Sequence, residues 1–441
     1  MKKLLFIFSM LFAGLGMHAQ TPELEKIKAY IDTLYKYERF MGAVSIYKDG
    51  RPVMDYAVGY RDYQQKVPIN LDTKFRVGSI SKTFTAVLIM KAVEDKKLSL
   101  NDSLSKYFPT VKNSDKVTIK NLLQHRSGIF NITNDPAYRQ YYQQPVTQQQ
   151  WVERISSKDP VFTPGEKYQY SNSNYILLTF ILEKVYKKDY ASLLNQYIVK
   201  PARLESTYYM RKTDVQQNEA YSYSWNIDSI WVKQNETDPS IPVGAGAISS
   251  NPRSLNQFSW ALFNGKIIKP GSLKAMQEVV DEVGLGLFRT KQGEQYYWGH
   301  GGAIDGFLSG YQVNSETGLS FSIAANAQYG GVDPVLADII KIYQGGDFKM
   351  PDYSKMLSNE EELKKYVGEY ATEGVPLKIN LIVKKGRLFG QATGQAPFEL
   401  SELSEGVYEF RPASIKVKLN GKADGFYFEQ GGNGIDFKRV K

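Results

Sequence analysis

Cysteine is absent from this 441-residue chain, and histidine occurs only three times. Without a thiol, the chain can form neither disulfides nor a thiolate metal site, and it has no thiol nucleophile. His18 lies in the N-terminal segment, which leaves His125 and His300 for the rest of the protein. Two histidines and no cysteine argue against a catalytic zinc site. We therefore expect no metal and no other cofactor.

Long hydrophobic runs are also missing after the first twenty residues. Residues 4–17 are almost wholly apolar and follow Lys2 and Lys3, and Ala19 offers the small side chain that a signal peptidase requires. This layout predicts a secretory signal peptide over residues 1–20, with an uncleaved anchor as the alternative. We expect a periplasmic or extracellular protein of bacterial type, without a transmembrane segment once the signal is removed.

No long run of one charge sign occurs either. The chain has 55 Lys and Arg against 46 Asp and Glu, which are interleaved and give a formal charge of +9. Nucleic acid is therefore not an expected partner. The expected partner is a small-molecule or peptide substrate, with cell-wall material as one source, and the oligomeric state stays open.

Strand patterns open and close the first three quarters of the chain, and helical patterns fill its middle. Two strands, 42–47 and 53–59, flank an Asp49-Gly50 turn signal, and four more are predicted at 284–289, 296–299, 306–313 and 319–325. Amphipathic periodicity predicts helices over 22–40, 79–93, 119–124, 146–155, 174–186, 254–263 and 334–343. The fold class is therefore α/β (α+β), with one antiparallel sheet, flanking helices and a helical region.

The last part of the chain has a different pattern, with short predicted strands separated by turn signals. Residues 345–359 read as a linker, and 366–440 contain about seven short strands with Asn-Gly and Gly-Gly turns, which predict a small β-barrel or sandwich. The predicted organisation is a signal peptide (1–20), a first domain (21–346), a linker (347–359) and a small all-β barrel (360–441).

A Ser-x-x-Lys string at Ser79-Ile80-Ser81-Lys82 is the first candidate for chemistry. Similar strings begin at Ser45, in a predicted strand, and at Ser103, in a polar connection. Only Ser79 opens a predicted helix, where residues three apart share a face and a lysine can reach the hydroxyl. The Ser79 amide is also a free donor at a helix start. The alternative is that Ser79 simply caps the helix.

A second candidate follows the turn at Pro164-Gly165. Tyr170 and Asn172 are presented just before the helix predicted over 174–186. A lysine beside a phenol lowers its pKa, so Tyr170 could act as a general base. Asn172 could hold Lys82 and a substrate amide at once. Alternatively, Tyr170 packs in the core and Asn172 caps the helix.

A third candidate is Gly299-His300-Gly301-Gly302-Ala303, at the end of a predicted strand. Glycines at a strand edge permit close approach of a substrate backbone. The amide of Ala303 could be a second oxyanion donor opposite that of Ser79. An ordinary turn is the alternative.

Together these strings resemble the serine β-lactamase and penicillin-binding-protein superfamily, in the branch of class C β-lactamases, D-aminopeptidases and serine esterases. The strings starting at Leu122 (Leu-Leu-Gln-His-Arg-Ser-Gly-Ile) and Gly244 (Gly-Ala-Gly-Ala-Ile-Ser-Ser) are also similar to that branch. The C-terminal part resembles the lipocalin-like domain that trails many such hydrolases.

The resemblance implies a serine hydrolase that forms an acyl-enzyme on Ser79, with Lys82 and Tyr170 as a proton relay. It further implies that the Ser79 and Ala303 amides bind the oxyanion, that Asn172, His300, Gly301 and Gly302 contact substrate, and that His125 lies behind the site. Glu166 is expected to cap a turn.

His300 stands where classical members have a lysine. A mostly neutral ring should bind carboxylates less well, which favours an ester or amide substrate, and carboxylate binding should improve as the pH drops and the ring gains charge. A D-Ala-D-Ala carboxypeptidase or β-lactamase remains an alternative. A non-catalytic scaffold or covalent sensor is another.

Overall fold

The computed structural model describes residues 22–226, 231–353, 360–384, 386–395, 397–410 and 413–440. The predicted signal peptide at 1–20 lies outside the described residues. Within these ranges, no helix is both long enough and apolar enough to cross a membrane.

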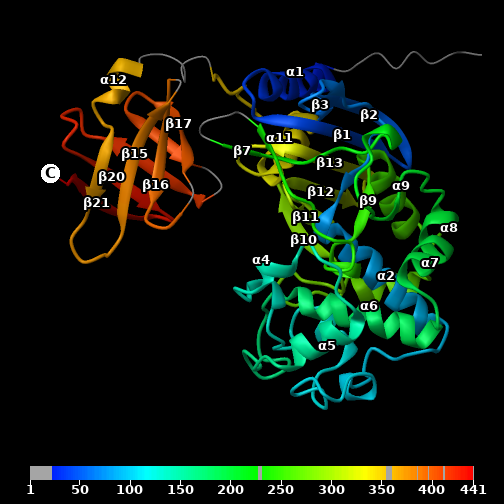
Figure 1. Ribbon diagram of the computed structural model, residues 1–441. Helices are drawn as coiled ribbons and strands as arrows, with labels where there is room; N and C mark the ends of the chain where they lie inside the picture. The colour runs from blue at the N-terminus through cyan, green and yellow to red at the C-terminus, as the bar shows by residue number, and fades with distance from the viewer. Residues whose placement is uncertain are drawn as a thin grey trace, which may run out of the picture.

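An eight-stranded sheet forms the centre of the first part of the chain (Figure 1). Its main path runs β10-β11-β12-β13-β1-β2 with antiparallel neighbours, while β7 pairs with β13 in parallel and β8 pairs with β7. The predicted meeting of opening and closing strands is confirmed, since Ser45 in β1 lies opposite Ser322 in β13. The strands are β1 (Phe40–Lys48), β2 (Arg51–Val58), β7 (Tyr223–Trp225), β8 (Trp231–Lys233), β10 (Phe288–Gln292), β11 (Gln295–Ile304), β12 (Phe307–Asn314) and β13 (Leu319–Gln328).

Helices cover both faces of this sheet. On one face, α1 (Pro22–Lys36) and α11 (Val332–Tyr343) pack against each other and against the strands. On the other face, α9 (Pro252–Phe263) contacts β1 and β13, and Phe84 of α2 (Ser81–Glu94) stacks on Phe258 of α9 with ring centroids 3.8 Å apart. Most residues of α2 are buried, which explains why its sequence is apolar around almost its whole circumference.

A helical region extends from α2, with α6 (Asn172–Tyr186) packed beside it (Figure 1). Its remaining helices are α3 (Ile119–Leu123), α4 (Tyr138–Tyr141), α5 (Gln148–Ser156), α7 (Tyr190–Leu194), α8 (Lys200–Ala202) and α10 (Pro270–Met276). Two small sheets complete this part, formed by β3 (Tyr60–Asp62), β4 (Val67–Pro68), β5 (Phe75–Arg76), β6 (Tyr208–Tyr209) and β9 (Ile248–Ser250).

One predicted strand is partly wrong. The strand expected over 284–289 begins only at Phe288. Leu285 and Leu287 are both buried, and Gly286 between them has a φ of 68°, so the chain turns where the pattern suggested an extended segment.

The second part is a closed barrel of eight antiparallel strands in sequence order, one strand more than predicted. An up-and-down barrel of eight strands is also the architecture of lipocalins. Its elements are α12 (Glu360–Lys364), β14 (Gly368–Ala371), β15 (Lys378–Lys384), β16 (Arg387–Ala392), β17 (Phe398–Ser404), β18 (Val407–Phe410), β19 (Ile415–Leu419), β20 (Gly425–Gln430) and β21 (Asn433–Arg439).

The described portion of the predicted linker packs against the first part of the chain. Phe348 meets Tyr30 of α1 edge-on, with ring centroids 5.0 Å apart, and Tyr353 lies 5.6 Å from Tyr37. Residues 347–353 are therefore held by apolar contacts that their composition did not suggest.

Candidate active site

Ser79 lies in a 3₁₀ turn, η1 (Gly78–Ile80), that runs directly into α2. The residues that cap the two helical starts are Val77 and Ile80, and neither makes a side-chain capping bond. The capping alternative for Ser79 is therefore wrong. Its Oγ lies instead 2.9 Å from Lys82 Nζ, and Ser79 lines a pocket.

The other two Ser-x-x-Lys strings lack this arrangement. Ser45 bonds to Asp55 within the sheet, and Ser103 caps a short 3₁₀ turn by accepting from the Ser105 amide. Position at the start of α2 therefore distinguishes Ser79 from both.

Lys82 is fully buried and its amine has three polar neighbours. Besides Ser79 Oγ, Nζ lies 2.8 Å from Asn172 Oδ1 and 2.7 Å from the carbonyl oxygen of Ala245. The last two are pure acceptors, so each takes an N–H from the amine. Burial lowers the pKa of Lys82 well below its ordinary value. In its neutral form the amine has two N–H groups and one lone pair, so with both N–H groups donated to these acceptors the lone pair would face the Ser79 hydroxyl.

Tyr170 lies against both Lys82 and His125. Lys82 Nζ is 4.9 Å from the centroid of the Tyr170 ring, and the His125 ring stacks on it at 4.2 Å. The Tyr170 phenol is within hydrogen-bonding reach of Ser79, but burial raises the pKa of Tyr170 above its usual value of about 10. The expected lowering by a neighbouring lysine is therefore wrong in direction, because burial of the phenol disfavours the phenolate.

His125 supports this wall of the site from behind. Its Nδ1 accepts the Ser171 amide at 3.0 Å, and burial lowers the pKa of His125 well below its ordinary value. The neutral ring fixes Tyr170 by stacking and fixes the backbone just before α6 by the hydrogen bond.

Asn172 begins α6 but does not cap it, since Ser171 occupies the cap position. Its Oδ1 accepts from Lys82, and its Nδ2 donates to Thr133 Oγ1 at 3.0 Å. The side-chain amide therefore orients Lys82, and its N–H is engaged within the protein. Glu166 accepts the Thr163 amide at 3.1 Å, as expected of a turn cap.

The 3₁₀ turn packs closely on β11. A Cβ built on Gly302 would lie 2.0 Å from the Val77 carbonyl oxygen, and one built on Gly78 would lie 2.8 Å from the Ala303 backbone. These glycines let the chain segment carrying Ser79 approach Ala303, which lines the same pocket. The close approach at Gly302 is thus to the protein's own backbone, whereas a Cβ built on Gly301 would meet only ordinary van der Waals contacts, the nearest at 3.7 Å.

His300 is buried beside Phe288, with ring centroids 4.9 Å apart, and does not line the pocket. Its Nδ1 lies 2.5 Å from the Gly301 carbonyl oxygen. Burial lowers the pKa of His300 to about 3. The ring therefore stays neutral at every physiological pH. The prediction that carboxylate binding improves as His300 gains charge near its ordinary pKa of about 6.5 is wrong, because the buried ring does not become charged there.

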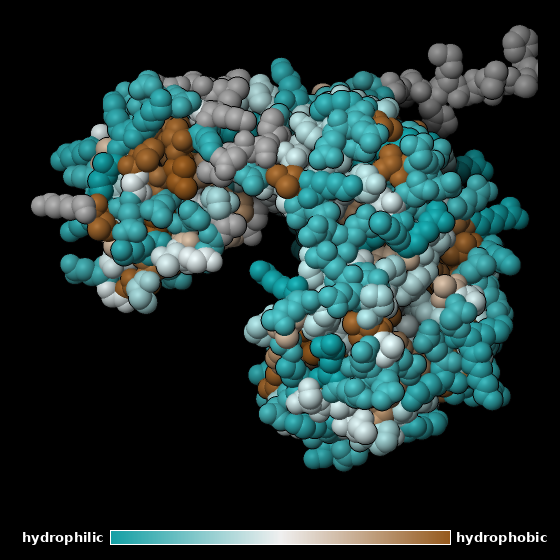
Figure 2. Space-filling model, viewed as in Figure 1, coloured by the Kyte–Doolittle hydropathy of each residue, from teal (hydrophilic) through white to brown (hydrophobic). Residues whose placement is uncertain are grey.

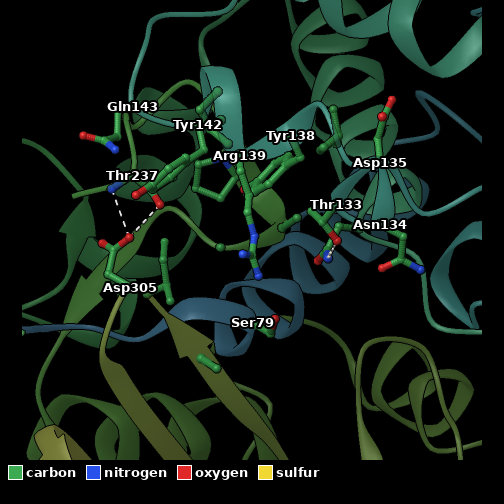
Figure 3. A pocket seen from close by; sticks show the side chains of 18 of the residues that line it. Ser79, Thr133, Asn134, Asp135, Tyr138, Arg139, Tyr142, Gln143, Thr237 and Asp305 are labelled. Atoms are coloured by element: carbon green, nitrogen blue, oxygen red, sulfur yellow. Dashed lines mark hydrogen bonds between the residues drawn. The ribbon is translucent and has the colours of Figure 1, made fainter. Parts of the chain in front are cut away.

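A pocket of about 900 Å³ opens in front of Ser79 (Figure 3). Ser79, Asn172 and Ala303 reach it, while Lys82, Tyr170 and His125 stand behind its wall. Sequence reasoning missed Thr133, Ala245 and Arg139, although two of them sit in or near the strings that begin at Leu122 and Gly244. In the described ranges, no cluster of His, Asp or Glu could hold a metal ion.

The fold and this constellation define an α/β sandwich with a Ser-Lys-Tyr site between its sheet and its helical region. The beta-lactamase family profile matches residues 27–344, and the chain belongs to this family. The resemblance to this superfamily in the sequence is thereby confirmed.

Several relatives are hydrolases by name. Teichoic acid D-alanine hydrolase from Staphylococcus aureus is 26% identical over 259 residues, which are 57% of this chain. The chain spans 62% of the length of that relative. A D-stereospecific amidohydrolase from Streptomyces is 27% identical with a TM-score of 0.61, covering 72% of this chain and 96% of that one.

The octameric penicillin-binding protein homologue from Pyrococcus abyssi has the same fold over both parts. It is 23% identical with a TM-score of 0.69, covering 95% of this chain and 98% of that one.

Proposed function

We propose that this protein is a serine hydrolase that cleaves an ester or a peptide amide through an acyl-enzyme on Ser79. One observation carries the proposal. The buried Lys82 amine lies 2.9 Å from the Ser79 hydroxyl and is held there by two fixed acceptors, Asn172 Oδ1 and the Ala245 carbonyl oxygen. Neither a scaffold nor a ligand-binding module needs a buried neutral lysine at a serine.

In this proposal Lys82 takes the Ser79 proton as Oγ bonds to the substrate carbonyl carbon. The amides of Ser79 and Ala303 stabilise the oxyanion, and loss of one such donor typically raises the barrier by ~3 to 4 kcal/mol. Tyr170 stays protonated because its pKa is raised, so it donates its proton to the leaving alcohol or amine and recovers one from Lys82. Water then attacks the acyl ester and releases the acid.

The bond attacked is proposed to belong to a D-amino-acid ester or amide. The names of the Staphylococcus and Streptomyces relatives support this class. The buried, neutral His300 supplies no cation at the position where a β-lactamase or carboxypeptidase would bind a carboxylate. This argues against the alternative of a β-lactam-directed enzyme.

Export is part of the proposal, carried by the composition of residues 1–20 and by the envelope polymer in the Staphylococcus relative's name. The N-terminal sequence of the protein recovered from a bacterial periplasm should begin near residue 21. Retention of Met1 would contradict export with cleavage.

The test of the activity combines substrate turnover with covalent labelling. Purified residues 21–441 should hydrolyse acyl esters or D-amino-acid amides faster than a chromogenic cephalosporin. A fluorophosphonate should add to Ser79, and Ser79→Ala should abolish both turnover and the adduct. Ser103→Ala, which alters another Ser-x-x-Lys string, is the matched control and should still be labelled. An adduct at another serine, or no adduct at all, would overturn the proposal.

A further inference from the structure

The pocket in front of Ser79 contains one positive charge that the proposed chemistry does not use. Arg139 lies on α4, lines the pocket, and points from that helix toward Ser79 (Figure 3). In the described part of the chain its guanidinium has neither an ion pair nor a hydrogen bond.

The two carboxylates of the same pocket are already neutralised by other cations. Asp305 accepts from Arg76 at 3.0 Å and from the Thr237 amide at 3.0 Å. Asp135 pairs with Lys158, whose Nζ lies 2.5 Å from Oδ2. Arg139 is therefore not the counterion of Asp305 or of Asp135, and its positive charge at the pocket wall is not paired with either carboxylate.

Other residues that line the same pocket are polar and uncharged. Gln143 and Asn235 contribute amide groups, and Tyr138 and Tyr142 contribute aromatic rings. Amide N–H groups around a guanidinium suit an anion, because the guanidinium offers paired donors and the amides complete its coordination.

We propose that Arg139 forms an anion-binding subsite for a carboxylate or phosphate group carried by the substrate at a distance from the bond that is cleaved. This deepens the proposed function, on which its role in turnover rests. The subsite lies on the helical side of the pocket, away from the buried His300. The enzyme would then select anionic esters or amides by a charge on α4.

The test uses matched esters that end in a neutral, a carboxylate or a phosphate group, placed in one set on the acyl portion and in another on the alcohol portion. In at least one of the two ester sets, Arg139→Gln should lower kcat/KM for the anionic ester relative to the neutral ester by about tenfold. The reason is that a charge-assisted hydrogen bond is stronger than a neutral one. Arg139→Lys should keep part of the preference. The carboxylate and phosphate arms identify which anion the substrate carries.

Arg51 provides the control for net charge, because it is an exposed arginine on the β1–β2 hairpin outside the pocket. Arg51→Gln should leave every ratio unchanged. An equal loss of the ratio in Arg51→Gln and Arg139→Gln would overturn the proposal, since the effect would then be a long-range one of total charge.

A binding experiment separates this inference from the proposed hydrolysis. In the Ser79→Ala background, calorimetry should show that adding Arg139→Gln weakens binding of the anionic ester by about tenfold, because a charge-assisted contact is lost. Equal affinities with and without that substitution would overturn the subsite even if the wild-type enzyme turns over esters. A retained difference without any turnover would leave the subsite standing and overturn the hydrolase proposal.

Discussion

At the scale of single residues, burial decides the protonation states in this site. Burial lowers the pKa of Lys82 well below its ordinary value, which favours the neutral amine. Tyr170 keeps its proton for the same reason, since a buried phenolate without a cation is costly. In the proposed mechanism, the base for Ser79 is therefore Lys82, and Tyr170 is the acid.

The first prediction tests whether these two residues share one proton path. Lys82→Ala and Tyr170→Phe should each slow acylation by about 10²-fold or more, which is the usual contribution of general acid–base groups. The double variant should be barely slower than the worse single one, because either change interrupts the same path. Pre-steady-state acylation rates with an activated ester measure this. Multiplicative losses would mean that the residues act independently.

The second prediction concerns His300 and acid stability. Its pKa of about 3 in the folded state lies below the ordinary value of about 6.5, so the unfolded chain binds a proton that the folded chain does not. Folding stability is therefore fully present above pH 6.5 and decreases as the pH falls from 6.5 toward 3, by up to ~1.4 kcal/mol per pH unit.

Replacing His300 with the neutral glutamine should remove this contribution. Between pH 7 and pH 5, His300→Gln should lose about 2 kcal/mol less of its unfolding free energy than the wild type, as measured by urea denaturation. Identical pH slopes in the two proteins would show that folding does not lower the pKa of His300.

At the scale of elements, the sequence predicts the chemistry-bearing segments better than their contacts. Ser79 and Lys82 share a helix face, so their spacing alone predicts that they meet. Asn172 and the Ala245 carbonyl reach the same amine from segments 90 and 163 residues away, and no local pattern reveals that meeting. The predicted pKa shifts of Tyr170 and His300 were wrong for the same reason, because burial results from packing across the whole fold.

Secondary structure was likewise predictable where local residue preferences decide it and not where packing decides it. The Asp49-Gly50 hairpin was predictable because both residues adopt the positive φ that such turns require. The segment 284–289 was predicted wrongly, because Leu285 and Leu287 are both buried, as alternate residues of a strand would be, although the chain turns at Gly286 between them.

The third prediction addresses the contact of η1 with β11. Gly302→Ala would place a methyl group 2.0 Å from the Val77 carbonyl oxygen and 2.6 Å from Ser309 Oγ, which cannot be accommodated without moving the turn that carries Ser79. We expect a loss of about 1 to 3 kcal/mol in unfolding free energy, as for other overpacked sites, together with slower fluorophosphonate labelling.

The neighbouring glycine supplies the matched control for this prediction. Gly301→Ala meets nothing closer than 3.7 Å, so its unfolding free energy should change by only about 0.5 kcal/mol. Equal destabilisation by the two alanines would mean that strand propensity, and not the contact with Val77, sets the requirement for glycine.

At the scale of the whole molecule, the barrel is joined to the first part of the chain by a small buried polar cluster. Glu399 of β17 has no exposed side-chain surface and pairs with Arg39, and Arg387 of β16 lies 3.3 Å from Glu38. The Tyr329 hydroxyl contacts the Glu399 amide, and Phe389 stacks on Trp225 of β7 with ring centroids 5.0 Å apart. Figure 1 shows the barrel beside the sheet and not over the helical region.

The cluster and the Trp225–Phe389 stack connect the barrel to the segment before β1 and to β7. Figure 2 shows an open gap between the barrel and the helical region on the visible face. The Pyrococcus homologue covers 95% of this chain with the same fold, so both parts occur together there as well. We expect the contact to stabilise the arrangement of the two parts, so its effect should be measured on stability first and on activity second.

The last prediction follows from the burial of Glu399. Removing one partner of a buried ion pair leaves the other charge without compensation and typically destabilises by about 3 to 5 kcal/mol. Glu399→Ala should therefore lower the unfolding free energy by an amount in that range, or split thermal unfolding into two transitions as the barrel separates from the sheet. Glu369→Ala breaks an exposed pair with Lys378 in the same barrel, and it should cost less than ~1 kcal/mol. If both variants unfold in one transition with equal small losses, the cluster does not hold the two parts together. Trp225 and Phe389 would then have to carry the contact through apolar stacking alone, and Phe389→Ala would become the variant that separates them.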